Sequence, residues 1–424
     1  MRVVVAGVKL KSSGVTRWAA GMMCLTLLLS SSTMAEGGWV IKRDEHMDSP
    51  LLKDRKAVAM TPEQQEQQVL AAAYQQALQV EQQKIREHWA SAEVSGRSRW
   101  VAYSSDYATK RVVDFARNQI EISIDGIYAG SRLDFAAMGK KVQSELEDTL
   151  ATTLKKALNQ DPVQVAMHDA LVKIGGSTDP VESGADLVLD ELFSSRHPSQ
   201  SDIRVKAAAM MRNASIRYQA LSASIVTVPV ITGRKLTYVI PLPDNRIRKK
   251  VLEYKPLVER NAERFSLSED VIMAIIHTES HFNPLARSSV PAFGLMQIVP
   301  STAGRDAAAK LGRRHHVLTA RYLYAPKHNI EIGAAYLNVL YYDYLKDIKN
   351  PQSRLYYTIA SYNAGPSSVA LAFVDKPSFQ DAVDEINRMS PQQVLERIMQ
   401  HAPRDETRQY VEKVLKRRNY YAKL

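Results

Sequence analysis

The sequence predicts an α+β protein in which a mixed α/β region precedes a region made almost entirely of helices. Residues 100–103 and 112–124 are rich in β-branched and aromatic residues, and the isoleucines at 120, 122 and 124 alternate with other residues as in a strand. From Asn245 almost to the C-terminus, apolar residues recur at the spacing of helices. Pro241 and Pro243 flank the change of pattern. The 424 residues are enough for two or three domains.

The N-terminal segment has the pattern of a secretory signal. Four basic residues precede a hydrophobic run over residues 18–29, which is too short to span a membrane, and Thr33-Met34-Ala35 resembles a cleavage site. We expect a signal peptide over residues 1–35 and a flexible lead over 36–60. No later run is apolar and long enough to cross a membrane, so we expect no transmembrane segment in the mature chain.

Charge and cysteine usage narrow the choice of partners. The net charge is +11, and loss of the four basic residues in the signal leaves +7, which favours a polyanionic envelope surface or carboxylate-rich peptides. We expect no nucleic-acid partner, because the chain is exported and lacks a basic-aromatic motif. The one cysteine, Cys24, lies in the signal, so no disulfide is expected. Lipid attachment at Cys24 is disfavoured, because the hydrophobic run continues to Leu29.

The mixed region is expected to form an accessory α+β domain over residues 61–244. Its predicted helices are a glutamine-rich one over 61–87 and three more over 136–158, 163–174 and about 187–193. Its predicted strands cover 100–103, 112–124, 215–230 and 235–240, and a Gly/Ser/Asp-rich connection covers 175–184. A scaffold or positioning role is the simplest interpretation of this domain.

The helical region, residues 245–424, contains a buried carboxyl candidate. Ser266 and Glu269 suggest a capping box, and isoleucines at 272, 275 and 276 define an apolar face that Glu279 shares. Burial disfavours the charged carboxylate and raises its pKa, which is the property of a general acid. Asn283, which precedes a proline, is expected to end the helix. On position alone, a structural Glu paired with a buried Arg is an equal alternative.

Three motifs accompany this carboxyl in sequence order. They are Glu-Ser-His-Phe-Asn-Pro at 279–284, Gly-Leu-Met-Gln at 294–297 and Ala-Ser-Tyr-Asn-Ala-Gly at 360–365. Together they resemble the lysozyme-like domain of family 1 lytic murein transglycosylases. Residues 329–337 and 406–411 are similar to two further family stretches, whereas Ala325 stands where the family commonly has Asp. The resemblance covers residues 249–424 well, and the upstream region loosely resembles the accessory domain of membrane-bound members.

The resemblance implies a function and a set of site residues. Glu279 would be the sole catalytic carboxylate, cleaving the MurNAc-GlcNAc β-1,4 bond of peptidoglycan and leaving 1,6-anhydro-MurNAc ends, without metal or cofactor. Tyr362 would point its hydroxyl toward Glu279, Asn363 would support the helix junction or the sugar, and Gly294 would let the backbone approach a ligand. The implied substrate-binding residues are Ser280, Met296, Gln297, Tyr362, Asn363 and Tyr410.

Several alternatives stay open. Ser280 can bond its own helix backbone, Met296 can be core, and Tyr362 can be a buried tyrosine bonded to backbone. A lysozyme-type muramidase would need a second acid to hold water, for which Asp306 and Asp343 are weak candidates. A non-catalytic peptidoglycan-binding scaffold is the other alternative.

The spacing of His277 and His281 would also suit zinc, but Glu279 faces away from both, and we expect solvent-facing histidines.

The expected location is the periplasm, reached through the cleaved signal peptide, with peripheral association with the outer membrane or cell wall also compatible. The expected partners are peptidoglycan glycan strands, with other cell-wall enzymes as further candidates.

Overall fold

The computed structural model describes residues 62–130, 132–174, 186–218, 235–313 and 318–424, and all of these lie in one compact unit. The predicted signal peptide, the lead over 36–60 and the connection over 175–184 lie outside the described residues. The expected boundary between an accessory and a catalytic domain near residue 244 stays a prediction. Within the described ranges, no helix combines the length and apolar character needed to cross a membrane.

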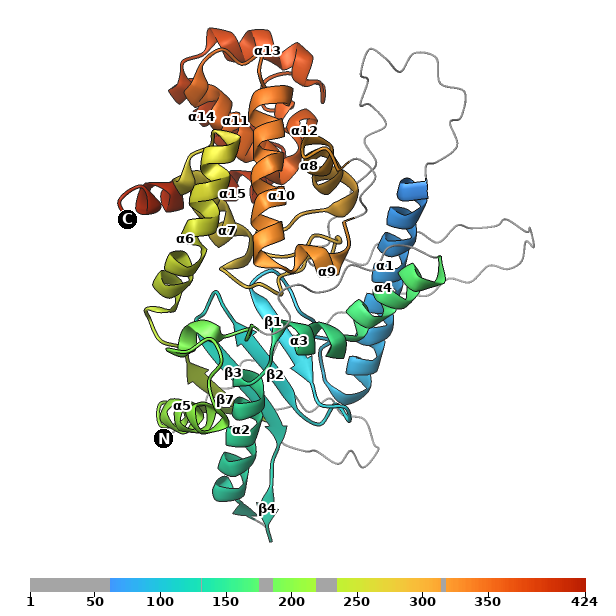
Figure 1. Cartoon of the computed structure of the whole chain (residues 1–424), viewed down its shortest axis with the longest axis vertical. Helices are drawn as coiled ribbons and strands as arrows, with labels where there is room; N and C mark the ends of the chain where they lie inside the picture. The colour runs from blue at the N-terminus through green and yellow to red at the C-terminus, as the bar shows by residue number, and fades with distance from the viewer. Residues whose placement is uncertain (1–61, 131, 175–185, 219–234, 314–317) are drawn as a thin grey trace, which may run out of the picture. The chain divides into compact units, whose positions relative to one another are not determined.

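A five-stranded antiparallel sheet forms the centre of the N-terminal region, in the order β1-β2-β3-β7-β6 (Figure 1). Its strands are β1 (Arg99–Tyr103), β2 (Lys110–Asp114), β3 (Gln119–Asp125), β6 (Ser215–Tyr218) and β7 (Lys235–Pro241), and a separate hairpin joins β4 (Tyr128–Ala129) to β5 (Arg132–Leu133). The predicted strands at 100–103 and 235–240 are confirmed. The single strand expected over 112–124 is wrong, because a turn ending at Asn118, which has a φ of 55°, separates β2 from β3.

The helices of the N-terminal region confirm part of the sequence prediction. They are α1 (Pro62–His88), α2 (Phe135–Leu150), α3 (Leu154–Gln160), α4 (Pro162–Lys173), the 3-10 turn η1 (Asp190–Leu192) and α5 (Gln200–Met211). The helix expected over 136–158 is two helices, because Thr153 caps a new one at Leu154. The helix expected near 187–193 is only η1. Helix α5 was not predicted, although Ser199 and Asp202 form its capping box.

The C-terminal region is helical, as predicted, so the α+β class is confirmed. Its longer helices are α6 (Arg246–Phe265), α7 (Glu269–Ser280), α10 (Pro326–Asn338), α11 (Pro351–Ala364), α13 (Phe379–Arg388), α14 (Pro391–His401) and α15 (Asp405–Tyr421). Shorter ones are η2 (Pro300–Gly304), α8 (Arg305–Lys310), α9 (Ala320–Leu323), η3 (Val339–Tyr344) and α12 (Pro366–Ala370).

Two predicted details of α7 are wrong. Ser266 does not open the helix: it ends α6 in the left-handed conformation, with a φ of 52°, and Ser268 precedes α7 without a side-chain cap. The helix stops at Ser280, because His281 is also left-handed, with a φ of 52°. The break therefore comes before Asn283, and the proline that follows is not its cause.

Hydrogen bonds tie the N-terminal helices to the loop that follows α7. The Tyr74 hydroxyl of α1 donates to the carbonyl of Ser288 at 2.5 Å, and the Tyr74 ring meets Phe293 edge to face. The Arg287 guanidinium, only 4% exposed, pairs with the Asp161 carboxylate at 2.8 Å. The glutamine-rich helix therefore packs against the region that carries the Gly-Leu-Met-Gln motif.

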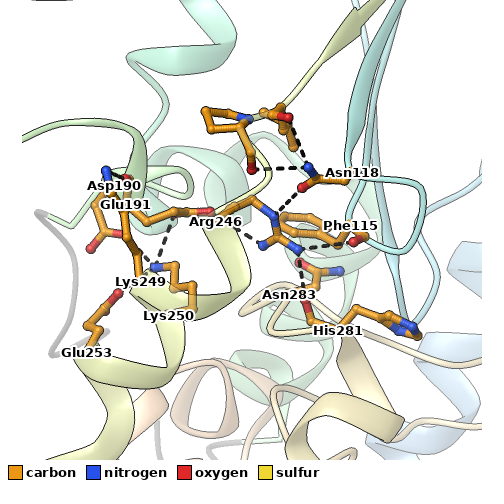
Figure 2. A network of polar contacts seen from close by, with 12 residues as sticks. Phe115, Asn118, Asp190, Glu191, Arg246, Lys249, Lys250, Glu253, His281 and Asn283 are labelled. Carbon is orange, nitrogen blue, oxygen red and sulfur yellow. Dashed lines mark hydrogen bonds and ion pairs between the residues drawn. The ribbon is translucent and has the colours of Figure 1, made fainter.

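A buried arginine at the start of α6 joins three parts of the chain (Figure 2). The Arg246 side chain is fully buried, and its Nε donates to Oδ1 of Asn118 at 3.0 Å. Its Nη2 donates to the carbonyl of Phe115 at 3.1 Å and to that of His281 at 3.4 Å. Arg246 therefore connects the β2–β3 turn to the residue that ends α7.

Lys250, one turn further along α6, extends this buried network (Figure 2). Its ammonium contacts the carboxylates of Asp190, Glu191 (3.4 Å) and Glu253 (2.9 Å). Glu191 also contacts Nη1 of Arg246 at 3.5 Å. Because desolvated charges are costly, the two cations and the carboxylates depend on one another.

We predict that Arg246→Met lowers the free energy of unfolding by about 3 kcal/mol or more, because it leaves Glu191 with one cation fewer and strips two buried carbonyls of a donor. Urea unfolding followed by circular dichroism measures the loss. Arg388→Met, at an arginine whose side chain is 75% exposed, should change stability by less than about 0.5 kcal/mol. Equal effects for the two variants would contradict a stabilising role for the network.

Candidate active site

Glu279 lies one residue before the end of α7, on the face that the sequence predicted to be buried. The residue is 5% exposed, and the isoleucines at 272, 275 and 276 are fully buried. Burial raises the pKa of the Glu279 carboxyl above its ordinary value, and it is the largest influence on that pKa. The predicted desolvation of the Glu279 carboxyl is therefore confirmed. Burial alone does not show a catalytic role.

Three polar groups surround the Glu279 carboxyl. Nη1 of Arg97 lies 3.9 Å from Oε2 of Glu279 and 3.4 Å from Oε1 of Glu406, at the start of α15. The charge of Arg97 and the hydroxyl of Tyr410 lower the pKa of Glu279, whereas the charge of Glu406 raises it. The tyrosine hydroxyl is buried and makes no hydrogen bond of normal geometry to another described residue. Sequence analysis identified Tyr410 but missed Arg97 and gave Glu406 no role.

Tyr362 approaches the same carboxyl from α11. Its pKa is raised well above the ordinary value by burial, and next by the charge of Glu279. Its hydroxyl donates to the carbonyl of Met296 at 2.8 Å rather than to Glu279. The hydrogen bond that the hydroxyl makes is therefore the one of the backbone-bonded alternative, and the orientation expected toward Glu279 stays a prediction.

Ser280 is also bonded to backbone. Its hydroxyl is completely buried and donates to the carbonyl of Ile276 at 2.9 Å, one turn earlier in α7. It makes no hydrogen bond with the carboxyl of Glu279 among the described residues. The backbone-bonded alternative is therefore the one observed for Ser280, because a hydroxyl at this position in a helix reaches its own i−4 carbonyl.

The Gly-Leu-Met-Gln motif forms a tight bend. Gly294 and Gln297 both have positive φ, at 77° and 50°, and Nε2 of Gln297 donates to the carbonyl of Gly294 at 3.0 Å. Oε1 of Gln297 is buried and has no hydrogen-bond partner among the described residues. Met296 is fully buried and lies against Gly333 of α10, as in the core alternative.

Asn329 of α10 holds this bend in place. Its Nδ2 donates to the carbonyls of Phe293 at 2.8 Å and Leu323 at 2.7 Å, and its Oδ1 accepts from the Met296 amide at 2.7 Å. A Cβ on Gly294 would overlap the Asn329 side chain, so protein packing requires a glycine here. Asn329 opened one of the family-like stretches, but its sequence position alone did not indicate these bonds.

Asn363 and Ala325, two further residues singled out in the sequence, lie near the ends of helices. Oδ1 of Asn363 accepts from the Thr407 hydroxyl at 2.9 Å, which joins α11 to α15. Ala325 precedes α10 without a side-chain cap, at the position where an Asp was expected. These contacts place Asn363 in the helix junction, one of its two expected roles.

His277 and His281 are half-buried, so the expected solvent-facing histidines are wrong. Nδ1 of His277 lies 2.8 Å from the Tyr421 hydroxyl, and Nε2 of His281 lies 3.2 Å from a nitrogen of Arg417. Burial, followed by the charge of Arg417, lowers the pKa of His277 to about 3 and that of His281 to about 4. Both are neutral near pH 7 and contact groups at the end of α15.

The two weak candidates for a second acid have other partners. Asp343 pairs with Lys310 at 2.9 Å, and Asp306 accepts from the Tyr344 hydroxyl at 3.0 Å. The second carboxylate near Glu279 is instead Glu406, because both contact the same nitrogen of Arg97. In the described ranges, no group of three or more His, Cys, Asp or Glu residues is arranged to hold a metal ion.

We predict that Asn329→Ala destabilises the protein by about 3 kcal/mol or more, because it takes the partner from the Met296 amide and from the carbonyls of Phe293 and Leu323. Asn338→Ala, on the same helix, removes one bond to the Phe265 carbonyl and should cost about 1 kcal/mol. Urea unfolding of both variants checks the difference. A cost for Asn329→Ala no larger than for Asn338→Ala would show that the bend does not depend on Asn329.

Comparisons with known proteins identify the family. Residues 256–383 match the model of the Transglycosylase SLT domain. The chain is 31% identical over 336 residues to membrane-bound lytic murein transglycosylase C of Edwardsiella ictaluri, covering 78% of this chain and 84% of that protein. It is 40% identical over 191 residues to the protein of the same name from Actinobacillus pleuropneumoniae, covering 45% and 51%.

Among solved structures, an inactive mutant of lytic transglycosylase Slt from Pseudomonas aeruginosa aligns with a TM-score of 0.32 and 29% identity, over 42% of this chain and 27% of that one. The assignment rests on the sequence matches: the SLT domain covers the helices that carry Glu279, the Gly294–Gln297 bend and Tyr362, and the match to the Edwardsiella protein extends over most of both chains. The chain therefore belongs to the lytic murein transglycosylases, enzymes that act on peptidoglycan.

Proposed function

We propose that Glu279 is the single general acid and base of this transglycosylase. In the first half of the reaction, its carboxyl donates a proton to the glycosidic oxygen between MurNAc and GlcNAc, and the C1–O bond breaks. In the second half, the resulting carboxylate takes the proton of the muramyl C6 hydroxyl as that oxygen bonds to C1. The products are a GlcNAc hydroxyl end and a 1,6-anhydro-MurNAc end, and Glu279 regains its proton.

The observation that carries this proposal is the burial of Glu279. A carboxyl that is 5% exposed and has a raised pKa can hold a proton where an exposed glutamate would have lost it. The carboxylate formed later stays beside Arg97 and Tyr410, which favour its charge. A carboxyl that first gives up a proton and then recovers it needs both burial, which favours the protonated form, and these neighbours, which favour the charged form.

The remaining predicted residues divide into two groups. We assign substrate contacts to Tyr410, Tyr362 and Gln297, since Tyr410 and Tyr362 lie near the carboxyl and Gln297 has an acceptor without a partner. We assign supporting roles to Ser280, Met296 and Asn363, which are bonded or packed within the protein.

Hydrolysis by a muramidase mechanism is the second candidate, and Glu406 is the observation that favours it. Two-carboxylate glycosidases place a second acid near the first, where it holds water or attacks the sugar. The Glu406 side chain is 46% exposed and contacts Arg97, so its carboxylate already has a cationic partner. This pairing makes it a weaker nucleophile or base, and the single-carboxyl mechanism is preferred.

The family relationship supports an envelope location for this enzyme. We further propose that residues 1–35 direct export to the periplasm and are then removed. The positive charge of the mature chain supports attraction to carboxylate-rich peptidoglycan. We also propose other cell-wall enzymes as partners of this protein.

We predict that the purified protein releases anhydro-muropeptides from cell-wall sacculi and that Glu279→Gln releases none, because an amide neither donates nor recovers the proton. Mass spectrometry of the soluble products separates the two mechanisms. Products with reducing ends would identify a muramidase, and no products from the wild type would favour a scaffold.

We also predict a pH-dependent difference in stability between wild type and Glu279→Gln. Below the ordinary pKa of glutamate the wild type is protonated in both the native and unfolded states. As the pH rises from there through the raised pKa of Glu279, the native state binds more protons than the unfolded state, so the wild type loses stability. The Tm of Glu279→Gln minus that of the wild type should therefore increase with pH.

Thermal unfolding between about pH 4 and pH 8 covers this window. Glu412→Gln, at an exposed position on α15, is the matched control and should show no such trend. A Tm difference for Glu279→Gln that is constant with pH would contradict a raised pKa.

A further inference from the structure

A short segment ahead of the sheet reaches the carboxyl at the end of α7. The segment is residues 95–97, which precede β1, and three hydrogen bonds hold its backbone. The carbonyl of Arg97 accepts from Nδ2 of Asn283 at 3.1 Å, that of Gly96 accepts from the amide of Arg287 at 3.3 Å, and that of Ser95 accepts from Nε of Arg287 at 3.3 Å. All the donors belong to the loop that follows α7.

The donors are themselves fixed. Asn283 is fully buried, and its Oδ1 accepts from the amide of Leu285 at 3.0 Å. Arg287 is buried and forms a two-oxygen contact with Asp161, at 3.0 and 2.8 Å. Donors of the loop therefore hold the backbone of residues 95–97. The position of Arg97 beside Glu279 does not depend only on the ion pairs of its own side chain.

Groups from three elements face Glu279. The segment before β1 supplies Arg97, α15 supplies Glu406 and Tyr410, and α11 supplies Tyr362. On α7 itself the histidines at 277 and 281 are neutral near pH 7. Arg97 is therefore the cation in contact with the carboxyl, and Glu406 is the acid that shares it.

We propose that Arg97 is a positioning residue that acts as the counter-ion of Glu279, and that Glu406 limits its effect by competing for the same guanidinium. This inference rests on the proposed role of Glu279 and adds a regulating pair to it. The pair comes from two regions of the chain, so the acid site is complete only when the segment before β1 is docked.

The two halves of the reaction explain why such a pair is useful. A cation 3.9 Å from the carboxyl stabilises the carboxylate that exists after protonation of the glycosidic oxygen. The same cation would weaken the proton-holding form if its whole charge acted on Glu279. Glu406, 3.4 Å from the same nitrogen, offsets part of that charge and so preserves the protonated state before cleavage.

The test is the pH dependence of kcat/KM on a soluble glycan substrate. Activity that needs protonated Glu279 declines on the alkaline side as this carboxyl ionises. Arg97→Gln should move this decline, the alkaline limb of the kcat/KM profile, to higher pH. Glu406→Gln should move the same limb to lower pH. Arg97→Lys should keep the wild-type limb, because it retains the charge. In Arg97→Gln, kcat should also decline by about tenfold, because the carboxylate loses its counter-ion.

Matched controls separate this role from others. Arg132→Gln, at an exposed arginine of β5, changes the net charge equally and should leave the profile unchanged. Thermal unfolding of each variant shows whether the fold is kept. Opposite displacements of the limb in Arg97→Gln and Glu406→Gln cannot come from a lost packing contact, since general destabilisation does not move the two variants in opposite directions.

The outcomes distinguish the inference from the proposed function. If Arg97→Gln raises KM with an unmoved limb, Arg97 is a substrate contact and the inference is wrong. It is also wrong if both variants shift the limb in the same direction. If instead Glu279→Gln stays active, the proposed function itself is refuted, whatever the Arg97 variants do.

Discussion

The site depends on the removal of one carboxyl group from water. Glu279 lies on the apolar face of α7, and the isoleucines that make this face bury it with them. Its protonated form is favoured by burial, whereas Arg97 and Tyr410 favour the charged form. A carboxyl held between these opposing influences can lose and regain a proton at modest cost, which a fully exposed or fully paired glutamate cannot.

Backbone conformation gives this carboxyl its surroundings. Residues in the left-handed region end α7 at His281 and form the bend at Gly294 and Gln297. Such sharp changes of direction leave backbone groups outside helical hydrogen bonding, and buried groups of this kind need partners. Asn329 supplies two of those bonds, to the Phe293 carbonyl and the Met296 amide, and a third to the Leu323 carbonyl at the end of α9. The bend beside Glu279 therefore depends on a residue of another helix.

The N-terminal region is part of the site's construction. Arg246 connects the β2–β3 turn to the carbonyl of His281, and residues 95–97 dock against Asn283 and Arg287. Both attachments fall within a few residues of the end of α7. The sheet region is therefore attached to the chain beside the helix end that carries Glu279.

The sequence by itself determined the α+β class, the helical C-terminal region, the strands at residues 100–103 and 235–240, and the burial of Glu279. These follow from local periodicity, because residues on one face of a helix or strand share their environment. Only the tertiary structure decided that Ser280 and Tyr362 bond to backbone, that Ser266 ends a helix, and that Arg97 lies beside a carboxyl 182 residues away in the chain. Such pairings depend on how distant segments pack, and the spacing of residues within one segment carries no record of them.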